Sequence, residues 1–428
     1  MNTAAVVLLG CPKNRVDAET LLAALGIAGY TLTPDPADAD LVVVTTCAFL
    51  RSAVRESEAA IRRALALRRR RPGLRVVVAG CLVQRLGRTL QRRFPGVELA
   101  VGIDYLTEVP RLLRLRAAYA CTTLPTASRP APRLPTTPRH YAYLKVADGC
   151  DNHCSYCLLP GIRGRFRSRR LPEVVGEARS LARAGAKELI LVAQDTTAYG
   201  RDIYRGPTLP RLLERLAGVP GVEWLRLMYT HPARYGPALL RELEHNPRLC
   251  RYVDVPIQHA ADTVLHRMNR HHTRADIERL IARLRAIDGI HLRTTVMVGF
   301  PGETEQEFTE LLRFLRAAEF DRLGAFEFSA EPGTPAAALR PRVPAALRAE
   351  RLAAVMELQA AISRRRLRRL RGETLSVLAD APDTARTEWD APEVDGVVRI
   401  TGRSLPPGEF ARVRITGSDE HDLTGRPV

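Results

Sequence analysis

Three cysteines stand close together in the stretch DGCDNHCSYCLLP, at Cys150, Cys154 and Cys157. Their spacing lets three thiolates of one short loop hold three irons of a [4Fe–4S] cube, whose fourth iron stays open to an outside ligand. A ligand with neighbouring amine and carboxylate groups could chelate that iron. The alternative is a zinc site completed by a distant residue such as His153 or His259. The spacing favours the cluster, because a lone histidine is more often a surface or core residue than a ligand.

Three further cysteines follow apolar runs near the start of the chain. Cys11, Cys47 and Cys81 come directly after AVVLLG, LVVVTT and VVVAG, spaced by about one βαβ repeat of ~30 or more residues. Because the carboxyl ends of parallel strands share one edge of a sheet, we expect these cysteines to converge. The helix N-termini that follow would favour thiolates and an anionic cluster. The alternative is buried, inert cysteine, which is how we interpret Cys121 and Cys250.

The elements that must position these cysteines begin with a small domain at residues 1–120. Apolar strands alternate there with helical stretches such as Asp17–Gly26 and Ser52–Arg70. This alternation predicts a parallel α/β domain. A proline-rich linker follows at residues 121–138.

Residues 139–366 continue the alternation over six βα units, which predicts an open, partial barrel. The site of such a barrel lies at the carboxyl ends of its strands, and Cys150 follows the first of them directly. A long helix, Ala345–Arg371, leads into residues 367–428, where TLSVLAD, GVVRITG and ARVRITG predict a small β-barrel. The predicted barrel strands are Tyr143–Ala147, Glu188–Ala193, Trp224–Tyr229, Tyr252–Ile257, Leu292–Val298 and Gly324–Ser329, with helices at Pro172–Ala184, Arg274–Ile287 and Glu303–Ala318.

The composition narrows the class of protein. The chain has 428 residues with 65 basic and 47 acidic side chains, a formal charge of +18. This charge would draw the protein toward RNA or a ribosome, although a merely soluble basic protein would share it. No apolar run reaches the length of a membrane span and no signal peptide is visible, so we expect a cytoplasmic protein without membrane contact. Its eight cysteines therefore favour metal or redox chemistry over disulfides.

The three-cysteine loop, with Tyr156 just before its last cysteine, resembles the signature of radical S-adenosylmethionine (SAM) enzymes. The resemblance implies that SAM chelates the open iron of a [4Fe–4S] cluster held by Cys150, Cys154 and Cys157. It also implies that an electron from this cluster cleaves SAM to methionine and a 5′-deoxyadenosyl radical. A reducing electron donor is therefore an expected partner.

Together with the N-terminal cysteines, the whole chain resembles the radical SAM methylthiotransferases. The resemblance implies a second [4Fe–4S] cluster on Cys11, Cys47 and Cys81, whose open iron carries the sulfur to be inserted. It implies two SAM molecules, one to methylate that sulfur and one to generate the radical that abstracts hydrogen from the acceptor carbon. The expected fold class is α/β: a small parallel N-terminal domain, a partial (βα)6 radical SAM barrel and a small C-terminal β-barrel of the TRAM type.

Two branches of this family act on tRNA adenosine or on the β-carbon of an aspartate in ribosomal small-subunit protein S-twelve. Several stretches resemble the second branch, including Pro12 and Lys13 after the first cysteine and Gln194 and Asp195 after the second barrel strand. Thr45 departs from the family's usual asparagine without removing a ligand. The runner-up is the tRNA enzyme, and a remote alternative is a non-catalytic iron–sulfur or zinc protein that binds RNA. The stretches are GCPKNRVDAE, AQDTTAYG, PRHYAYLKVADGC, MYTHP, DVPIQHA and EWDAPEVDG.

Further residues are candidates for contacts with SAM. Val298, Gly299 and Gly302 belong to VGFPGE, where glycines allow close backbone approach and the resemblance places the adenine nearby. Gln194 and Asp195 end a barrel strand and could meet the SAM amine or the substrate, unless Asp195 merely caps the next segment. We expect no catalytic residue beyond the cluster ligands. The full set of cofactor candidates is Tyr156, Gln194, Asp195, Val298, Gly299 and Gly302.

The basic residues bear on partners. The arginines after the cluster loop could anchor the carboxylate of SAM or an acidic substrate loop, although most should be solvated. We expect a monomer whose substrate is protein S-twelve and whose TRAM barrel contacts the ribosome or its RNA. These arginines are Arg163, Arg165, Arg167, Arg169 and Arg170.

Overall fold

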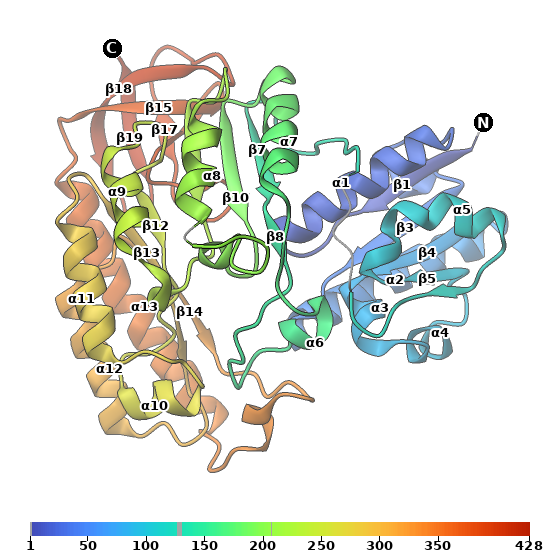
Figure 1. Ribbon diagram of the computed structural model, residues 1–428, viewed down its shortest axis with the longest axis horizontal. Coiled ribbons are helices and arrows are strands. Elements are labelled where there is room, and N and C mark those ends of the chain that lie inside the picture. Colours follow the sequence, from blue (N-terminus) through green and yellow to red (C-terminus); the bar gives the residue numbers. More distant parts are fainter. Residues whose placement is uncertain (1, 126–130, 207) are drawn as a thin grey trace.

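The computed structural model describes residues 2–125, 131–206 and 208–428. A smaller N-terminal lobe, drawn in blue in Figure 1, lies beside a larger lobe that ends in the red C-terminal barrel. Part of the predicted linker, residues 126–130, lies outside the described residues. The predicted α/β fold class is confirmed, with the C-terminal barrel closed.

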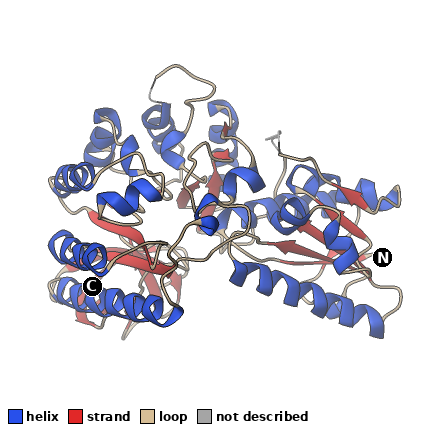
Figure 2. Ribbon diagram, turned by 90° about the horizontal axis from the view of Figure 1, so that it is seen from below, coloured by secondary structure: helices blue, strands red, loops and turns tan. Residues whose placement is uncertain are grey.

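The smaller lobe is a parallel sheet of six strands in the order β2-β1-β3-β4-β5-β6. Its middle strands are β-branched and apolar, and β3 (Leu41–Thr46) is buried at every position. Strand β3 is buried because helices cover both faces of this sheet, as Figure 2 shows. The other elements of this lobe are β1 (Thr3–Val7), α1 (Pro12–Ile27), β2 (Thr31–Leu32), α2 (Arg51–Arg70), β4 (Arg75–Gly80), α3 (Cys81–Leu86), α4 (Thr89–Arg93), β5 (Leu99–Val101), α5 (Val109–Arg114) and β6 (Tyr119–Ala120).

The larger lobe contains two parallel three-stranded sheets, β7-β10-β11 and β12-β13-β14. A parallel bridge between Leu225 and Leu249 links them, so the six strands follow one another in chain order as an open barrel. The strands are β7 (Tyr141–Lys145), β10 (Glu188–Val192), β11 (Trp224–Leu227), β12 (Tyr252–Asp254), β13 (His291–Val298) and β14 (Arg322–Glu327). The other elements are β8 (Ala147–Asp148), α6 (Leu159–Arg163), β9 (Arg167–Ser168), α7 (Leu171–Arg183), α8 (Thr208–Ala217), α9 (Pro237–His245), α10 (Asp262–Arg267), α11 (Arg274–Arg285), α12 (Glu305–Ala318) and α13 (Ala345–Arg368).

Five of the six barrel strands end one to three residues earlier than predicted, and the backbone explains this for β11 and β12. Strand β11 stops at Leu227 because Tyr229 adopts φ +59°, a left-handed backbone that leaves the sheet. Strand β12 stops at Asp254, just before Pro256, which has no N–H to donate to a neighbouring strand. Both departures occur at the carboxyl end of the barrel, where the chain turns inward.

The C-terminal barrel closes in the order β15-β16-β17-β19-β18. Its strands are β15 (Thr374–Ala381), β16 (Thr384–Thr387), β17 (Val398–Ile400), β18 (Phe410–Ser418) and β19 (Leu423–Pro427). Glu188 at the start of β10 connects the C-terminal barrel to the open barrel of the larger lobe. Its carboxylate pairs with Arg226 of β11 at 2.6 Å and with Arg386 of β16 at 2.8 Å. In the part of the chain that the structure describes, no helix is long and apolar enough to cross a membrane.

Candidate functional site

A cavity of about 460 Å³ lies where the carboxyl ends of the N-terminal sheet meet those of the barrel. The loops after β1, β3 and β4 contribute from one side, and the loops after β8, β10, β11 and β12 contribute from the other. All six cysteines predicted as ligands line this one cavity: Cys11, Cys47, Cys81, Cys150, Cys154 and Cys157. Cys121 and Cys250, interpreted as non-ligands, are absent from its described lining.

The N-terminal cysteines converge because the strand ends approach closely. Cys11 caps α1, Cys47 follows β3 and Cys81 opens α3. Gly10 makes this possible, since it adopts φ +100° and a side chain there would meet the Cβ atom of Cys47 at 3.0 Å. Burial raises the pKa of Cys81 to about 12, although the neighbouring Arg163 acts in the opposite direction. A bound metal would add positive charge here and favour the thiolate form.

The second cysteine set lies in the loop between β8 and α6. Backbone N–H groups of Asn152 and Leu159 point at the Sγ atoms of Cys150 and Cys157, each at 3.4 Å. The guanidinium of Arg270 lies 3.7 Å from the Sγ atom of Cys154. Such donors stabilise the negative charge of thiolates, so the loop fits a bound iron–sulfur cluster.

The two histidines considered for the zinc alternative, His153 and His259, are not among the described residues that line this cavity. His259 is fully buried, and its Nδ1 atom accepts a hydrogen bond from the backbone N–H of Ala261 at 3.0 Å. Over residues 2–125, 131–206 and 208–428, no three His, Cys, Asp or Glu side chains are arranged to hold a single metal ion.

Three of the predicted cofactor residues line the same cavity, namely Tyr156, Gln194 and Asp195. The carboxylate of Asp195 is buried and accepts hydrogen bonds from Asn152 and Arg234, each at 2.8 Å. It also accepts one from the hydroxyl of Thr197 at 2.5 Å. Asp195 therefore joins the cluster loop to the barrel strands, which a simple helix cap would not do.

The glycine-containing turn after β13 lies apart from the cavity. Gly299 lines a neighbouring cavity of about 200 Å³, which Arg348 also lines. Val298 is buried in the core, and the N–H of Gly302 donates to the carbonyl of Pro341 at 2.8 Å. Neither Val298 nor Gly302 is among the described lining residues of the cysteine cavity, so in this structure the turn packs against the segment before α13.

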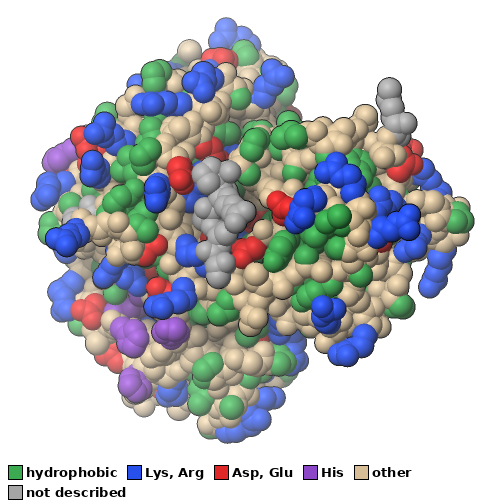
Figure 3. Space-filling view, turned by 45° about the vertical axis from the view of Figure 1, so that its right-hand side comes forward, with side chains coloured by type: hydrophobic (Ala, Val, Ile, Leu, Met, Phe, Trp, Pro, Cys, Tyr) green, Lys and Arg blue, Asp and Glu red, His purple; other side chains and the backbone are tan. Residues whose placement is uncertain are grey.

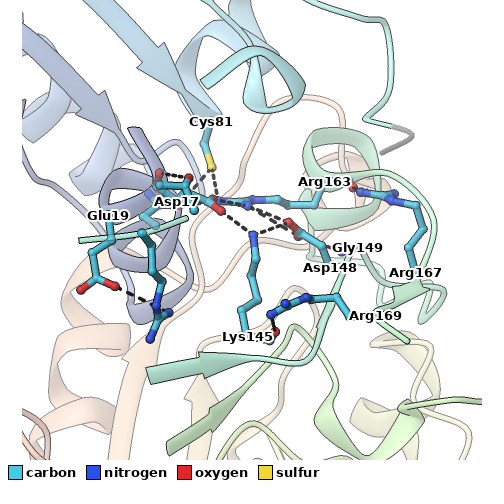
Figure 4. A network of polar contacts seen from close by, with 12 residues as sticks. Asp17, Glu19, Cys81, Lys145, Asp148, Gly149, Arg163, Arg167 and Arg169 are labelled. Atoms are coloured by element: carbon cyan, nitrogen blue, oxygen red, sulfur yellow. Dashed lines mark hydrogen bonds and ion pairs between the residues drawn. The ribbon is translucent and has the colours of Figure 1, made fainter. Parts of the chain in front are cut away.

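A buried charge network joins the two lobes beside the cavity (Figure 4). Arg163 of α6 donates to Asp17 of α1 at 2.7 Å, to Asp148 of β8 at 3.1 Å and to the Sγ atom of Cys81 at 3.3 Å. Lys145 pairs with the same two carboxylates. Burial alone would raise the pKa of Asp148, but Arg163 and Lys145 outweigh it and hold that pKa well below its usual range. The network fixes the N-terminal cysteines relative to the cluster loop.

Sequence reasoning did not identify Lys13 or Tyr229 as cavity residues. Lys13 lies in the first turn of α1, and its amine is 3.3 Å from the centroid of the Tyr229 ring. Tyr229 and Gln258 both have a left-handed backbone, at φ +59° and +70°, and both line the cavity. Strained backbone of this kind is typical of functional sites. The signal in the sequence was that Tyr229 ends one predicted barrel strand and Gln258 follows another.

Three regions of the chain match known families. Residues 3–102 match the uncharacterized protein family UPF0004, residues 144–315 match the Radical SAM superfamily and residues 372–428 match the TRAM domain. Together with the cysteine-lined cavity at the carboxyl ends of an open barrel, they define a radical SAM enzyme, whose cofactors are iron–sulfur and SAM. The non-catalytic alternative is thereby excluded.

Curated relatives narrow this class. The ribosomal protein uS12 methylthiotransferase RimO of Pelotomaculum thermopropionicum is 44% identical over 441 residues, covering 99% of this chain and 98% of the relative. RimO of Geobacter sulfurreducens is 41% identical, covering 99% and 98%. RimO of a Thermoanaerobacter species is 37% identical, covering 99% and 100%. The chain belongs to the RimO family of radical SAM methylthiotransferases, which confirms the predicted family and enzyme class.

Solved structures share the fold at low sequence identity. The radical SAM methyltransferase TsrM from Kitasatospora setae, with cobalamin and a [4Fe-4S] cluster bound, is 16% identical with a TM-score of 0.57. The match covers 88% of this chain and 77% of TsrM. The cobalamin-dependent SAM radical enzyme OxsB, with aqua-cobalamin and SAM bound, is 13% identical with a TM-score of 0.55, covering 84% and 56%. These likenesses support the arrangement of a small parallel domain beside a radical SAM barrel.

Proposed function

We propose that this chain adds a methylthio group to the β-carbon of an aspartate in ribosomal protein uS12. In this proposal Cys150, Cys154 and Cys157 hold one [4Fe–4S] cluster with SAM at its open iron. The N-terminal set of Cys11, Cys47 and Cys81, which lies on the other lobe, holds the second cluster. The observation that carries the proposal is that both cysteine sets line a single cavity.

When bound, the two clusters and two SAM molecules supply a methylated sulfur and a 5′-deoxyadenosyl radical. The chain's own residues place these two sources against one acceptor carbon. Arg163 holds the two lobes in register, and the N–H groups of Asn152 and Leu159 stabilise the charge of the cluster loop. Asp195 and Arg234 form a fixed ion pair at the barrel wall, so the wall presents oriented polar groups.

His231 is a poor candidate for ordinary base catalysis in this cavity. His231 lines the cavity, but burial and the nearby Arg270 lower its pKa to about 2. A neutral imidazole with so low a pKa is a weak base, whereas the β-carbon of an aspartate is a very weak acid. Hydrogen abstraction by a radical removes the need for a base. The cofactors carry the chemistry and the protein supplies position.

The partners in this proposal follow from charge and domain content. Arginines and lysines are spread over both lobes in Figure 3, in keeping with the formal charge of +18. We propose that the TRAM barrel contacts the ribosome or its RNA, that a reducing donor supplies electrons, and that the enzyme works as a monomer in the cytoplasm. The second candidate, tRNA adenosine as acceptor, rests on the same charge and on the TRAM match.

The test is a direct competition between the two acceptors. Both clusters are reconstituted anaerobically, SAM and a reductant are added, and a peptide of the uS12 aspartate loop and unmodified tRNA are offered in parallel. Mass spectrometry follows both. We expect a methylthiolated peptide and unchanged tRNA. A modified nucleoside with an unchanged peptide would overturn the substrate assignment while leaving the radical enzyme class intact.

A further inference from the structure

Lys13 differs from the other two lysines of the chain. Lys145 and Lys187 each have a carboxylate within ion-pair distance, at Asp17 and Glu409. None of the ion pairs of the described residues involves Lys13, although its side chain is only 8% exposed. The nearest negative charges, at Cys11, Asp254 and Asp148, lie beyond ion-pair distance, so an anion that enters the cavity can reach the ammonium group of Lys13 directly.

The other charges of the cavity wall already have partners. Asp195 is paired with Arg234. Arg163 is paired with two carboxylates, and Arg270 donates to a carbonyl oxygen at 2.8 Å and faces the sulfur of Cys154. Among the described residues that line the cavity, Lys13 is therefore the cation that has no partner within ion-pair distance. Its ammonium group can bind an incoming anion.

The position of Lys13 selects between the possible anions. It belongs to the N-terminal lobe, two residues after Cys11, whereas the loop with Cys150, Cys154 and Cys157 belongs to the barrel. Arg270 already faces that barrel loop, where the proposed SAM cluster lies. Lys13 instead extends from α1 onto the ring of Tyr229, between the N-terminal cysteines and the strand ends. In the proposed function the acceptor carbon must reach both cysteine sets, and Lys13 lines the cavity that contains them.

We propose that Lys13 binds the carboxylate of the acceptor side chain and makes the enzyme specific for an acidic residue. This inference rests on the proposed function and extends it to a named determinant. The ring of Tyr229 holds the ammonium group by a cation–π contact and leaves its N–H donors free for carboxylate oxygens. A neutral amide or a nucleobase edge would leave the buried ammonium without its counter-charge. The specificity is therefore a difference between the affinities for an acidic and a neutral acceptor, and the charge of Lys13 causes that difference.

The experiment measures binding in a two-by-two design. Reconstituted holoenzyme without reductant is titrated with two uS12 loop peptides, one with the native aspartate and one with asparagine at that position. Wild type and Lys13→Gln are compared. We expect wild type to prefer the aspartate peptide by about tenfold to a hundredfold, the range of a hydrogen bond to a charged group. Lys13→Gln should bind both peptides within about threefold of each other, and Lys13→Arg should retain part of the preference.

Controls separate a binding role from a structural one. Iron and sulfide content and the affinity for SAM should be the same in wild type and Lys13→Gln. If Lys13→Gln does not fold, the affinities of wild type for the two peptides still test the proposal. Equal affinity for the aspartate and asparagine peptides would overturn it. A preference that persists in a folded Lys13→Gln would also overturn it. If wild type modifies tRNA and neither binds nor modifies the aspartate peptide, the proposed function is wrong as well. If Lys13→Gln still distinguishes the aspartate peptide from the asparagine peptide, only the inference about Lys13 is wrong.

Discussion

Arg163 connects the two lobes at the shared cavity, and its removal gives a quantitative test of that contact. Arg163→Met removes the guanidinium and keeps an unbranched side chain of similar reach. Asp17 and Asp148 must then share the single charge of Lys145, so one negative charge stays buried without a partner. Breaking a buried ion pair costs about 3–5 kcal/mol, and the remaining Lys145 places the expected cost at the lower end, about 3 kcal/mol.

The assay is native-state hydrogen exchange in α6, the helix that carries Arg163. Five residues are too few for a helix to be stable alone, so α6 depends on its tertiary contacts. The amides of Ile162 and Gly164 donate to carbonyl oxygens at 3.1 Å and report its opening. A cost of about 3 kcal/mol makes opening easier, and we expect these amides to exchange about a hundredfold faster than in wild type.

Two companion variants make this test decisive. Arg165→Met is the matched control, because Arg165 lies two residues after the end of α6 but its side chain is 90% exposed, and it should leave exchange within about threefold of wild type. Adding Asp148→Asn to Arg163→Met removes the unpaired charge and should restore much of the protection. Unchanged exchange in Arg163→Met would refute the reasoning that Arg163 closes the contact between the lobes.

Three further predictions follow from other parts of the structure. Glu188→Gln leaves the buried Arg226 without a carboxylate partner, while Arg386 keeps Asp380 at 2.7 Å, and the change should lower the urea midpoint by the equivalent of about 3 kcal/mol. Arg399→Ala, which removes an exposed pair, should leave the midpoint close to that of wild type. Burial lowers the pKa of His259 to about 3, so the unfolded chain binds a proton that the folded chain does not. Stability should be full above pH ~6.5 and fall by up to about 1.4 kcal/mol per unit below it, a slope that is reduced in His259→Gln when urea midpoints at several pH values are compared. Cys81→Ala should lower the iron content of reconstituted protein by about half while Cys250→Ala leaves it unchanged, and equal iron in both would contradict the proposed ligand set.

The cysteine positions could be predicted from the sequence because each lies at a strand end, where spacing along the chain becomes proximity in space. β-branched runs predicted the strands before Cys11, Cys47 and Cys81, and the topology of a parallel sheet then placed those residues at one edge. The same argument placed Gln194 and Asp195 at the barrel mouth. Each inference needed only local pattern and one rule of topology.

Contacts between the lobes could not be predicted in this way. Arg163 and Asp17 are 146 residues apart, and nothing in either segment indicates the other. Strands β16 and β19 were also missed, because their sequences TART and LTGRP lack the apolar alternation that signals a strand. Both are stabilised by the closure of the barrel, which is a tertiary effect rather than a local one.

The contact between the lobes uses charge where apolar packing would be more stabilising, and this choice can be tested. Buried ion pairs often contribute little net stability, but few arrangements satisfy all their donors and acceptors, so they can fix one geometry.

Replacing the four charged residues together, as Asp17→Leu, Lys145→Met, Asp148→Leu and Arg163→Met, removes every charge of the network and leaves none unpaired. We expect this variant to unfold at a urea concentration close to that of wild type, yet to let the lobes shift relative to each other. In the proposed function, SAM cleavage needs only the barrel loop, whereas product formation needs both cysteine sets aligned. The ratio of methylthiolated peptide to 5′-deoxyadenosine should therefore fall at least tenfold while 5′-deoxyadenosine formation continues. A variant that keeps the wild-type ratio would show that the network stabilises the lobes without aligning them.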